Sequence, residues 1–231
     1  MIEGAEDFSL TIATPGGVVA SQLTAAAPTT VTTTINDNDT ADWVLAQSAA
    51  QTSSGVNEGA SAIYTLTLDG SASGAPGAAA VQSGDTATIN LSLTNVDTLA
   101  GDFGETLGAA VSAAVTAFNG TATAGAPGTF SYAAGVVTFT GDGTQTAPQL
   151  TIDLDTSNDN LAEGAESFSL TIASPGGDVA SQLSTSAPTT VTTTINDNDL
   201  ATFSIVSDIN TVAEGDDVCL LYTSPSPRDR G

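Results

Sequence analysis

Acidic residues in this sequence gather at the ends of predicted strands, where several oxygen atoms come close together. Together with neighbouring asparagines they offer only oxygen donors. Oxygen donors on flexible loops favour Ca²⁺, which takes about 6 to 8 of them, whereas Mg²⁺ prefers a stricter octahedron and zinc or copper prefers nitrogen or sulfur. The groups are Asp155, Asp159, Glu163 and Glu166 with Asn158 and Asn160; Asp197 and Asp199 with Asn196 and Asn198; and Glu58 before a predicted strand.

The charge balance of the chain is extreme. The 231 residues contain 26 acids, two basic side chains and no histidine. Two carboxylates about 4 Å apart repel by about 4 kcal/mol at an effective dielectric constant near 20, and a bound cation would relieve that repulsion. A second interpretation is that Asp and Asn are good turn residues on a surface adapted to salt. The residues alone leave both interpretations open.

The last thirteen residues differ in character from the rest. CLLYTSPSPRD, residues 219–229, is similar to a translation of a transposase adapter used in short-read sequencing libraries. We interpret residues 219–231 as an artefact of sequence assembly, the alternative being a Pro/Ser linker. Cys219 and both arginines, Arg228 and Arg230, lie in this tail, so residues 1–218 carry 25 carboxylates and no basic side chain.

This composition excludes several classes of function. Without Cys, His or Lys, residues 1–218 have no disulfide and no thiol, imidazole or lysine chemistry. An anionic chain repels nucleic acid and anionic membranes, and no apolar run approaches the roughly 20 residues of a membrane helix. Paired carboxylates such as Glu163 and Glu166 would suit glycoside hydrolysis. They lie in a repeated segment, however, and an active site is rarely repeated along an array, so we expect no enzyme.

The chain contains an internal repeat. Residues 161–199 match residues 1–39 at 31 of 39 positions without a gap. Duplication at this identity indicates tandem units. We therefore predict the C-terminal part of one unit at residues 1–39, a complete unit at 40–199 and the start of a third at 200–218.

Alternating apolar residues predict short strands throughout the complete unit, from Trp43 to Ile195. Residues 105–119 are the exception, because Leu107, Val111, Val115 and Phe118 follow a helical spacing. Residues 71–80 predict a loop of small residues. About eight short strands separated by turn residues indicate an all-β fold of immunoglobulin-like β-sandwich repeats with one inserted short helix.

Four motifs resemble the Calx-β repeat, a calcium-binding immunoglobulin-like module: VNEG, AGDF, NDNLAEGAESFSLTI and a closing TINDND. The longer form of this unit is similar to repeats of large bacterial adhesins. The resemblance implies calcium ligands at Glu58, Asp102, Asp159, Glu163, Glu166, Asp197 and Asp199. It implies further ligands at Glu3, Glu6, Asp37 and Asp39 in the first segment and at Glu214 in the third.

The resemblance implies a structural function. We expect a calcium-binding spacer of a large secreted or cell-surface bacterial protein, in which Ca²⁺ stiffens the joints between neighbouring repeats. Host-surface or matrix ligands would bind other parts of the protein. The alternative is a carbohydrate- or protein-binding module, with Trp43, Tyr64 and Tyr132 as stacking residues. All three alternate as core residues, which argues against stacking.

Overall fold

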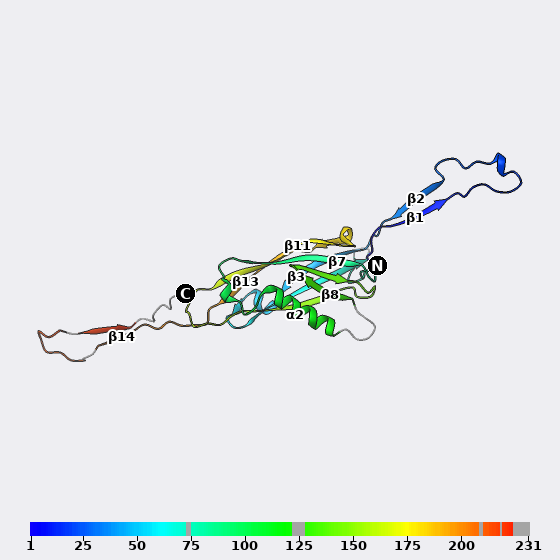
Figure 1. Cartoon of the computed structure of the whole chain (residues 1–231). Coiled ribbons are helices and arrows are strands. Elements are labelled where there is room, and N and C mark those ends of the chain that lie inside the picture. Colours follow the sequence, from blue (N-terminus) through cyan, green and yellow to red (C-terminus); the bar gives the residue numbers. More distant parts are fainter. Residues whose placement is uncertain (73–74, 122–127, 208–209, 218, 224–231) are drawn as a thin grey trace.

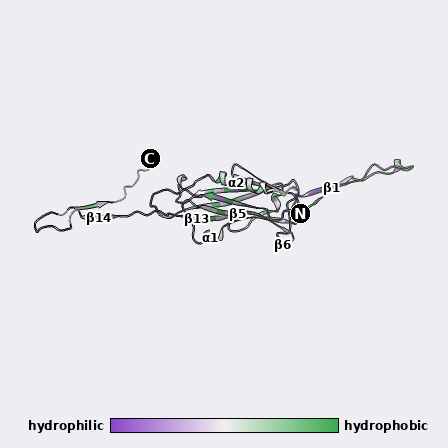
Figure 2. Cartoon of the chain, turned by 90° about the horizontal axis from the view of Figure 1, so that it is seen from below, coloured by the Kyte–Doolittle hydropathy of each residue, from purple (hydrophilic) through white to green (hydrophobic). Residues whose placement is uncertain are grey.

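The computed structural model describes residues 1–72, 75–121, 128–207, 210–217 and 219–223. It is elongated, with residues 40–199 forming a central body (Figure 1). A hairpin from the first segment projects from one end of the body, and the described residues after Asp199 extend from the other. A second view at right angles shows the same alignment (Figure 2).

Two sheets make up the body, as the alternating pattern predicts. The order of the first sheet is β10-β5-β3-β12, with β6 paired to β5. Its strands are β3 (Thr40–Gln47), β5 (Ser61–Ala72), β6 (Ala75–Pro76), β10 (Gln149–Asp155) and β12 (Leu183–Thr185). The order of the second sheet is β4-β13-β11-β7-β9-β8. Its strands are β4 (Val56–Asn57), β7 (Thr86–Asn95), β8 (Thr129–Ala133), β9 (Val136–Thr140), β11 (Glu166–Gly177) and β13 (Thr190–Asn196).

The two sheets enclose one core, which confirms the all-β sandwich. Every second residue of β5 is buried, and the strands of both sheets contribute to a single apolar cluster. Trp43 and Tyr64 are fully buried in this cluster, whereas Tyr132 is only half-buried against it. The Tyr64 hydroxyl, on the first sheet, bonds the Thr193 hydroxyl on the second. Burial raises the pKa of Tyr64 to about 12, because the ionised phenolate would lose its hydration.

The predicted helix forms as α2 (Leu107–Gly120) and closes one side of the sandwich. It contacts β10 and β8, which are the edge strands of the two sheets. The helix begins two residues later than predicted, because the Thr106 side chain accepts the N–H of Ala109 and caps it. At its other end, Phe118 packs edge-on against Phe130 with ring centroids 4.8 Å apart.

Other differences from the predicted elements are small. The predicted loop at residues 71–80 is partly strand, since β5 continues to Ala72 and pairs with β6; residues 73–74 lie outside the described residues. Three strands of only two or three residues, β4, β6 and β12, are too short for an alternating pattern to indicate. One-turn helices also occur: α1 (Ala49–Thr52), η1 (Ala20–Gln22), η2 (Ala100–Asp102) and η3 (Ala180–Gln182).

Outside the body, each end of the chain forms a two-stranded sheet. β1 (Glu6–Thr11) pairs with β2 (Thr30–Ile35), and β14 (Ser204–Ser207) pairs with β15 (Leu220–Thr223). The β1–β2 register is that of β11–β13 shifted by 160 residues: Glu6 faces Ile35 as Glu166 faces Ile195. Sequence identity at these positions therefore produces the same hairpin twice.

The two hairpins differ in what covers their apolar side. Phe168 and Leu170 of β11 are fully buried because β11 pairs with β7 and faces the other sheet. The equivalent Phe8 and Leu10 of β1 are 55% and 73% exposed. Hairpin geometry is thus local to these residues, whereas their burial requires the rest of a sandwich. Among the described residues, no helix is both long and apolar enough to cross a membrane.

Candidate metal centres

Glu58 is held at the end of the body by the short strand β4. β4 runs parallel to β13, with Val56 opposite Ile195, and the Glu58 N–H donates to the Asn196 carbonyl at 3.1 Å. The next residue, Gly59, has a φ of +73°, and a Cβ there would lie 2.9 Å from Cβ of Asn158. Only glycine fits this turn without strain, which explains why the VNEG motif ends as it does.

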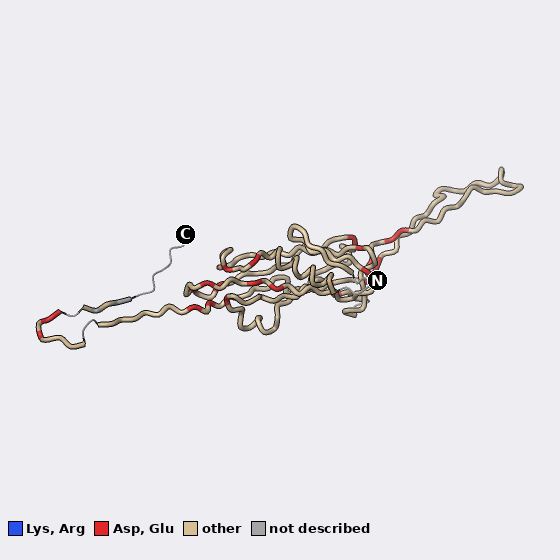
Figure 3. The backbone as a smooth tube through the Cα atoms, turned by 60° about the horizontal axis from the view of Figure 1, so that its bottom comes forward, with Lys and Arg blue, Asp and Glu red and all other residues tan. Residues whose placement is uncertain are grey.

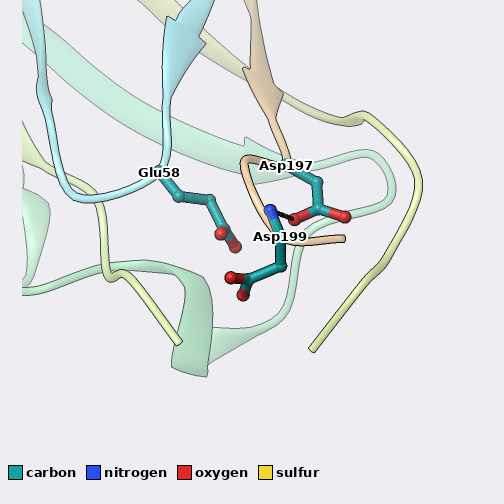
Figure 4. A group of neighbouring side chains, drawn as sticks. All are labelled: Glu58, Asp197 and Asp199. Carbon is teal, nitrogen blue, oxygen red and sulfur yellow. Dashed lines mark hydrogen bonds between the residues drawn. The ribbon is translucent and has the colours of Figure 1, made fainter. Parts of the chain in front are cut away.

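Asp197 and Asp199 follow β13 directly, so they lie beside Glu58. The Asp197 carboxylate accepts the backbone N–H groups of Glu163 and of Asp199, the latter at 2.8 Å. These two bonds fix the Asp197 side chain and close the turn after β13. Asp199 is consequently directed back toward Glu58 (Figure 4).

One oxygen from each of Glu58, Asp197 and Asp199 lies within 4.8 Å of the other two. We call these residues the first acidic group. Oε2 of Glu58 and Oδ2 of Asp199 are buried from solvent and have no hydrogen-bond partner in the protein. Burial, with the charges of Asp159, Asp197, Asp199 and Glu163, raises the pKa of Glu58. Both observations describe carboxylates that lack a counterion.

Asp102, Glu163 and Glu166 form a second acidic group under the same 4.8 Å limit. Asp102 lies at the end of η2, where its side chain accepts the N–H of Leu99. The η2 segment is held to the body because the Phe103 ring packs edge-on against Phe168, with centroids 5.1 Å apart. Glu163 links the two groups, since its N–H donates to Asp197.

Asp159 belongs to neither group. Its side chain is exposed, and its Oδ1 accepts the N–H of Leu161 at 2.7 Å. Its charge is nevertheless among those that raise the pKa of Glu58. Asp155, also in the predicted acidic loop, accepts the Ser61 hydroxyl at the end of β10. In the described structure, Asp155 and Asp159 add negative charge and local hydrogen bonds near the two acidic groups but are not part of either group.

The predicted ligands of the first segment lie at the opposite end of the body, where the β1–β2 hairpin leaves it. Asp37 accepts the N–H of Glu3 at 2.8 Å and that of Asp39 at 3.1 Å, the same bonds that Asp197 makes. The Asp39 carboxylate pairs with the ammonium group of Met1. Glu6 begins β1. Figure 3 shows acidic residues at both ends of the body, and Glu214 lies apart from both, exposed in a turn of the last segment.

The donor set of the first acidic group fits a hard divalent cation. All ligand atoms are carboxylate oxygens, two of them are buried without a partner, and the described residues contain no basic side chain that could neutralise them. A cation bound there would supply the missing counterion and would tie β4 to the end of β13. The second acidic group offers the same donor chemistry beside it.

Two features of this end were missed by sequence reasoning. The acidic residues divide into two groups, one that contains Glu58 after β4 and one that contains Asp102 at the end of η2. Amide side chains also connect the loops, since Asn198 Nδ2 donates to Asn158 Oδ1 at 2.8 Å. The asparagines in the NDN and DND triplets were the only signal available in the sequence for this link.

Comparison with known families gives a match to the larger, C-terminal part of the body. Residues 88–199 match the family model described as the Calx-beta domain. These residues belong to the Calx-beta family. The match begins in β7 and ends at Asp199, so it contains Asp102, Glu163 and both aspartates that close the first acidic group. Calx-beta domains are calcium-binding β-sandwich modules.

Solved structures give weaker similarities. The apo form of the Calx CBD1 domain is 11% identical, covers 68% of this chain and 99% of its own, and has a TM-score of 0.35. CBD12 from CALX1.2 is 12% identical, with 62% and 40% covered and a TM-score of 0.34. A cohesin–dockerin complex from Clostridium thermocellum is 9% identical, with 71% and 99% covered and a TM-score of 0.31. A search of curated protein sequences finds no match.

Proposed function

We propose that this chain is part of a calcium-binding spacer, in which Ca²⁺ bound at the ends of successive sandwiches restricts bending between them. The observation that carries the proposal is the pair of buried, unpartnered oxygens on Glu58 and Asp199 beside Asp197. A spacer role further requires that the acidic groups lie where one unit meets the next. Asp199 is followed by the last segment and Asp39 directly precedes β3, which is consistent with that position.

Tandem organisation is part of this proposal. The hairpin of residues 1–39 repeats the register and hydrogen bonds of residues 161–199, yet its apolar side is exposed. We infer that in the full array this side packs in the sandwich of a preceding unit. An array of such units would be a long, acidic rod whose bending depends on the cation at each joint.

The environment follows from the affinity of such a site. Extracellular modules bind Ca²⁺ with dissociation constants of about 10⁻⁴ to 10⁻³ M, so millimolar calcium fills them and low cytosolic calcium does not. We therefore propose a secreted or cell-surface protein, with the adhesin-like arrays of bacteria as the context. The proposed role is structural rather than catalytic, and target binding is assigned to other parts of the protein.

Calcium binding to the full chain tests the proposal. We expect the melting temperature measured in EDTA to rise when Ca²⁺ is added in excess. At a free calcium concentration of about 100 Kd, one bound ion should raise the free energy of unfolding by about 2.7 kcal/mol. Mg²⁺ should have a smaller effect, and monovalent salt at matched ionic strength should not replace Ca²⁺. If salt alone gives the full stabilisation, the acidic groups are a salt-adapted surface and the proposal fails.

The stiffening itself needs a separate measurement. Small-angle X-ray scattering of the full chain, in EDTA and in Ca²⁺, should show a narrower distribution of overall dimensions when calcium is present. If the chain binds calcium but its distribution of overall dimensions does not change, the metal sites are supported and the spacer role is contradicted.

A further inference from the structure

The beginning of the chain inserts into the body that follows it, at the end of the body opposite the two acidic groups. Ile2 is fully buried and belongs to the core cluster of the sandwich, although β1 of its own hairpin begins only at Glu6. Figure 1 shows the N-terminus against the body while the hairpin that follows it projects away. Ile2 therefore packs in the neighbouring unit rather than in its own.

Backbone pairing holds this residue in place. Ile2 forms a parallel bridge with Val81. Its N–H donates to the Ala80 carbonyl at 2.8 Å, and its carbonyl accepts the N–H of Gln82 at 2.9 Å. One residue of the preceding segment thus adds to the edge that residues 80–82 present, as in the strand addition seen in peptide recognition.

Two glycines shape the receiving surface, which we call the Ile2 site: Gly70, Gly141 and Ala79–Gln82. A Cβ at Gly70 would lie 1.8 Å from the Ala79 carbonyl oxygen and 3.2 Å from Cδ1 of Ile2. A Cβ at Gly141 would lie 2.4 Å from the Gln82 carbonyl oxygen. The loop that bonds Ile2 can approach the body this closely only because both positions lack a side chain.

In the second copy of the segment, the residue equivalent to Ile2 is not packed against another unit. Ala162 is the equivalent of Ile2 at an offset of 160, and it is exposed at the other end of the body. The adjoining loop is otherwise the same, because Glu163 bonds Asp197 as Glu3 bonds Asp37. Burial of position 2 is therefore supplied by the following unit and not by the loop itself.

We propose that the Ile2 site is a docking site for the preceding unit of the array, and that it accepts one extended residue with an aliphatic side chain without needing a cation. It deepens the spacer role proposed above and rests on it, since docking has meaning only between successive units. The joint then has two separate parts. Apolar insertion at residue 2 fixes the position of the units, and a cation at the carboxylates nearby restricts their bending.

Amide hydrogen exchange in the full chain tests the docking, with the Gln82 N–H as reporter because its acceptor is Ile2. In EDTA we expect the Gln82 amide to be protected in the unchanged chain and to exchange at least tenfold faster in Ile2→Asp. Ile2→Ala, which introduces the residue found at position 162, should give a smaller increase. Ile2→Val should restore protection.

Matched controls separate docking from general destabilisation. Ile12→Asp makes the same change at a side chain that is 60% exposed on the projecting hairpin, and it should leave Gln82 unchanged. The Leu68 amide, which donates to Pro148 within the body, should exchange equally in all variants. Rapid exchange of Gln82 in the unchanged chain in EDTA, or no effect of Ile2→Asp, would overturn the proposal.

Spin labels distinguish this inference from the calcium proposal. One label replaces Val18 near the hairpin tip and one replaces Asp153 on β10, in a Cys219→Ser background. Ile2→Asp should broaden the distance distribution in EDTA at least twofold relative to the unmutated label pair. If calcium narrows the distribution equally with and without Ile2→Asp while Gln82 is unprotected, the docking site fails and the calcium-dependent spacer stands.

Discussion

Glu58 and Asp199 face each other across the end of the sandwich, and each carboxylate holds one buried oxygen without a hydrogen-bond partner (Figure 4). They follow two neighbouring strands of one sheet, since Glu58 comes after β4 and Asp199 comes after β13. In the first segment the equivalent of Asp199, Asp39, pairs with the Met1 ammonium group.

Removing the Glu58 charge should have opposite effects with and without calcium. In EDTA, Glu58→Gln relieves repulsion among half-buried carboxylates, so we expect the unfolding free energy to rise by about 1 kcal/mol. The same substitution removes a calcium ligand, so the calcium affinity should fall at least tenfold. Isothermal titration calorimetry measures this affinity. Asp153→Asn is the control, because it makes the same charge change on an exposed residue outside both acidic groups. Equal effects of the two variants would contradict the assignment.

Asp197 should matter for stability even in the absence of metal. Its carboxylate accepts two backbone N–H groups, from Glu163 and Asp199, so Asp197→Ala leaves both without an acceptor. We expect a loss of about 1–3 kcal/mol in urea unfolding in EDTA. Asp197→Asn keeps one acceptor oxygen and should lose less. A loss seen only in the presence of calcium would mean that these two bonds contribute nothing to the fold.

Calcium binding should weaken as the pH falls toward the raised pKa of Glu58. Burial and four neighbouring carboxylates raise this pKa above 4.5, so the protonated form is favoured in the fold. In EDTA, the stability gained from the protonated Glu58 side chain is fully present below pH 4.5 and is lost as the pH rises through the pKa of the folded state. Calcium requires the ionised form, and therefore the calcium-induced rise in melting temperature should shrink as the pH falls from 7 toward 4.5. In Glu58→Gln, that pH dependence should be smaller.

Gly59 should be intolerant of a side chain. Its φ is +73° and a Cβ would meet Asn158 at 2.9 Å, so Gly59→Ala should cost about 1–2 kcal/mol and displace Glu58. We expect lower stability in urea and weaker calcium binding together. Gly164→Ala is the control, because Gly164 adjoins the acidic residue Glu163 as Gly59 adjoins Glu58, and a Cβ there meets nothing within 4 Å. Stability and calcium affinity equal to those of the control would contradict this account of the VNEG turn.

Much of the fold is predictable from the sequence because its determinants are local. Alternation places Tyr64 and Phe168 in the core, and helical spacing locates α2 to within two residues of each end. The duplicate segment predicts a duplicate hairpin, which forms with the same register. Short strands were missed for the same reason, since two residues such as Val56 and Asn57 carry no period and are held only by their partner strand.

The sequence by itself determined which atoms are available: oxygen donors in excess, no basic side chain before the tail, and a motif set typical of a calcium-binding repeat. Only the tertiary structure decided which carboxylates meet, because Glu58 and Asp199 are 141 positions apart and are brought together by the parallel pairing of β4 with β13. It also decided that Ile2 is a core residue of the next unit while Ala162 is exposed. The local pattern predicts the strand to which a residue belongs. Its burial and its distance to other functional residues depend on which distant segment packs against it.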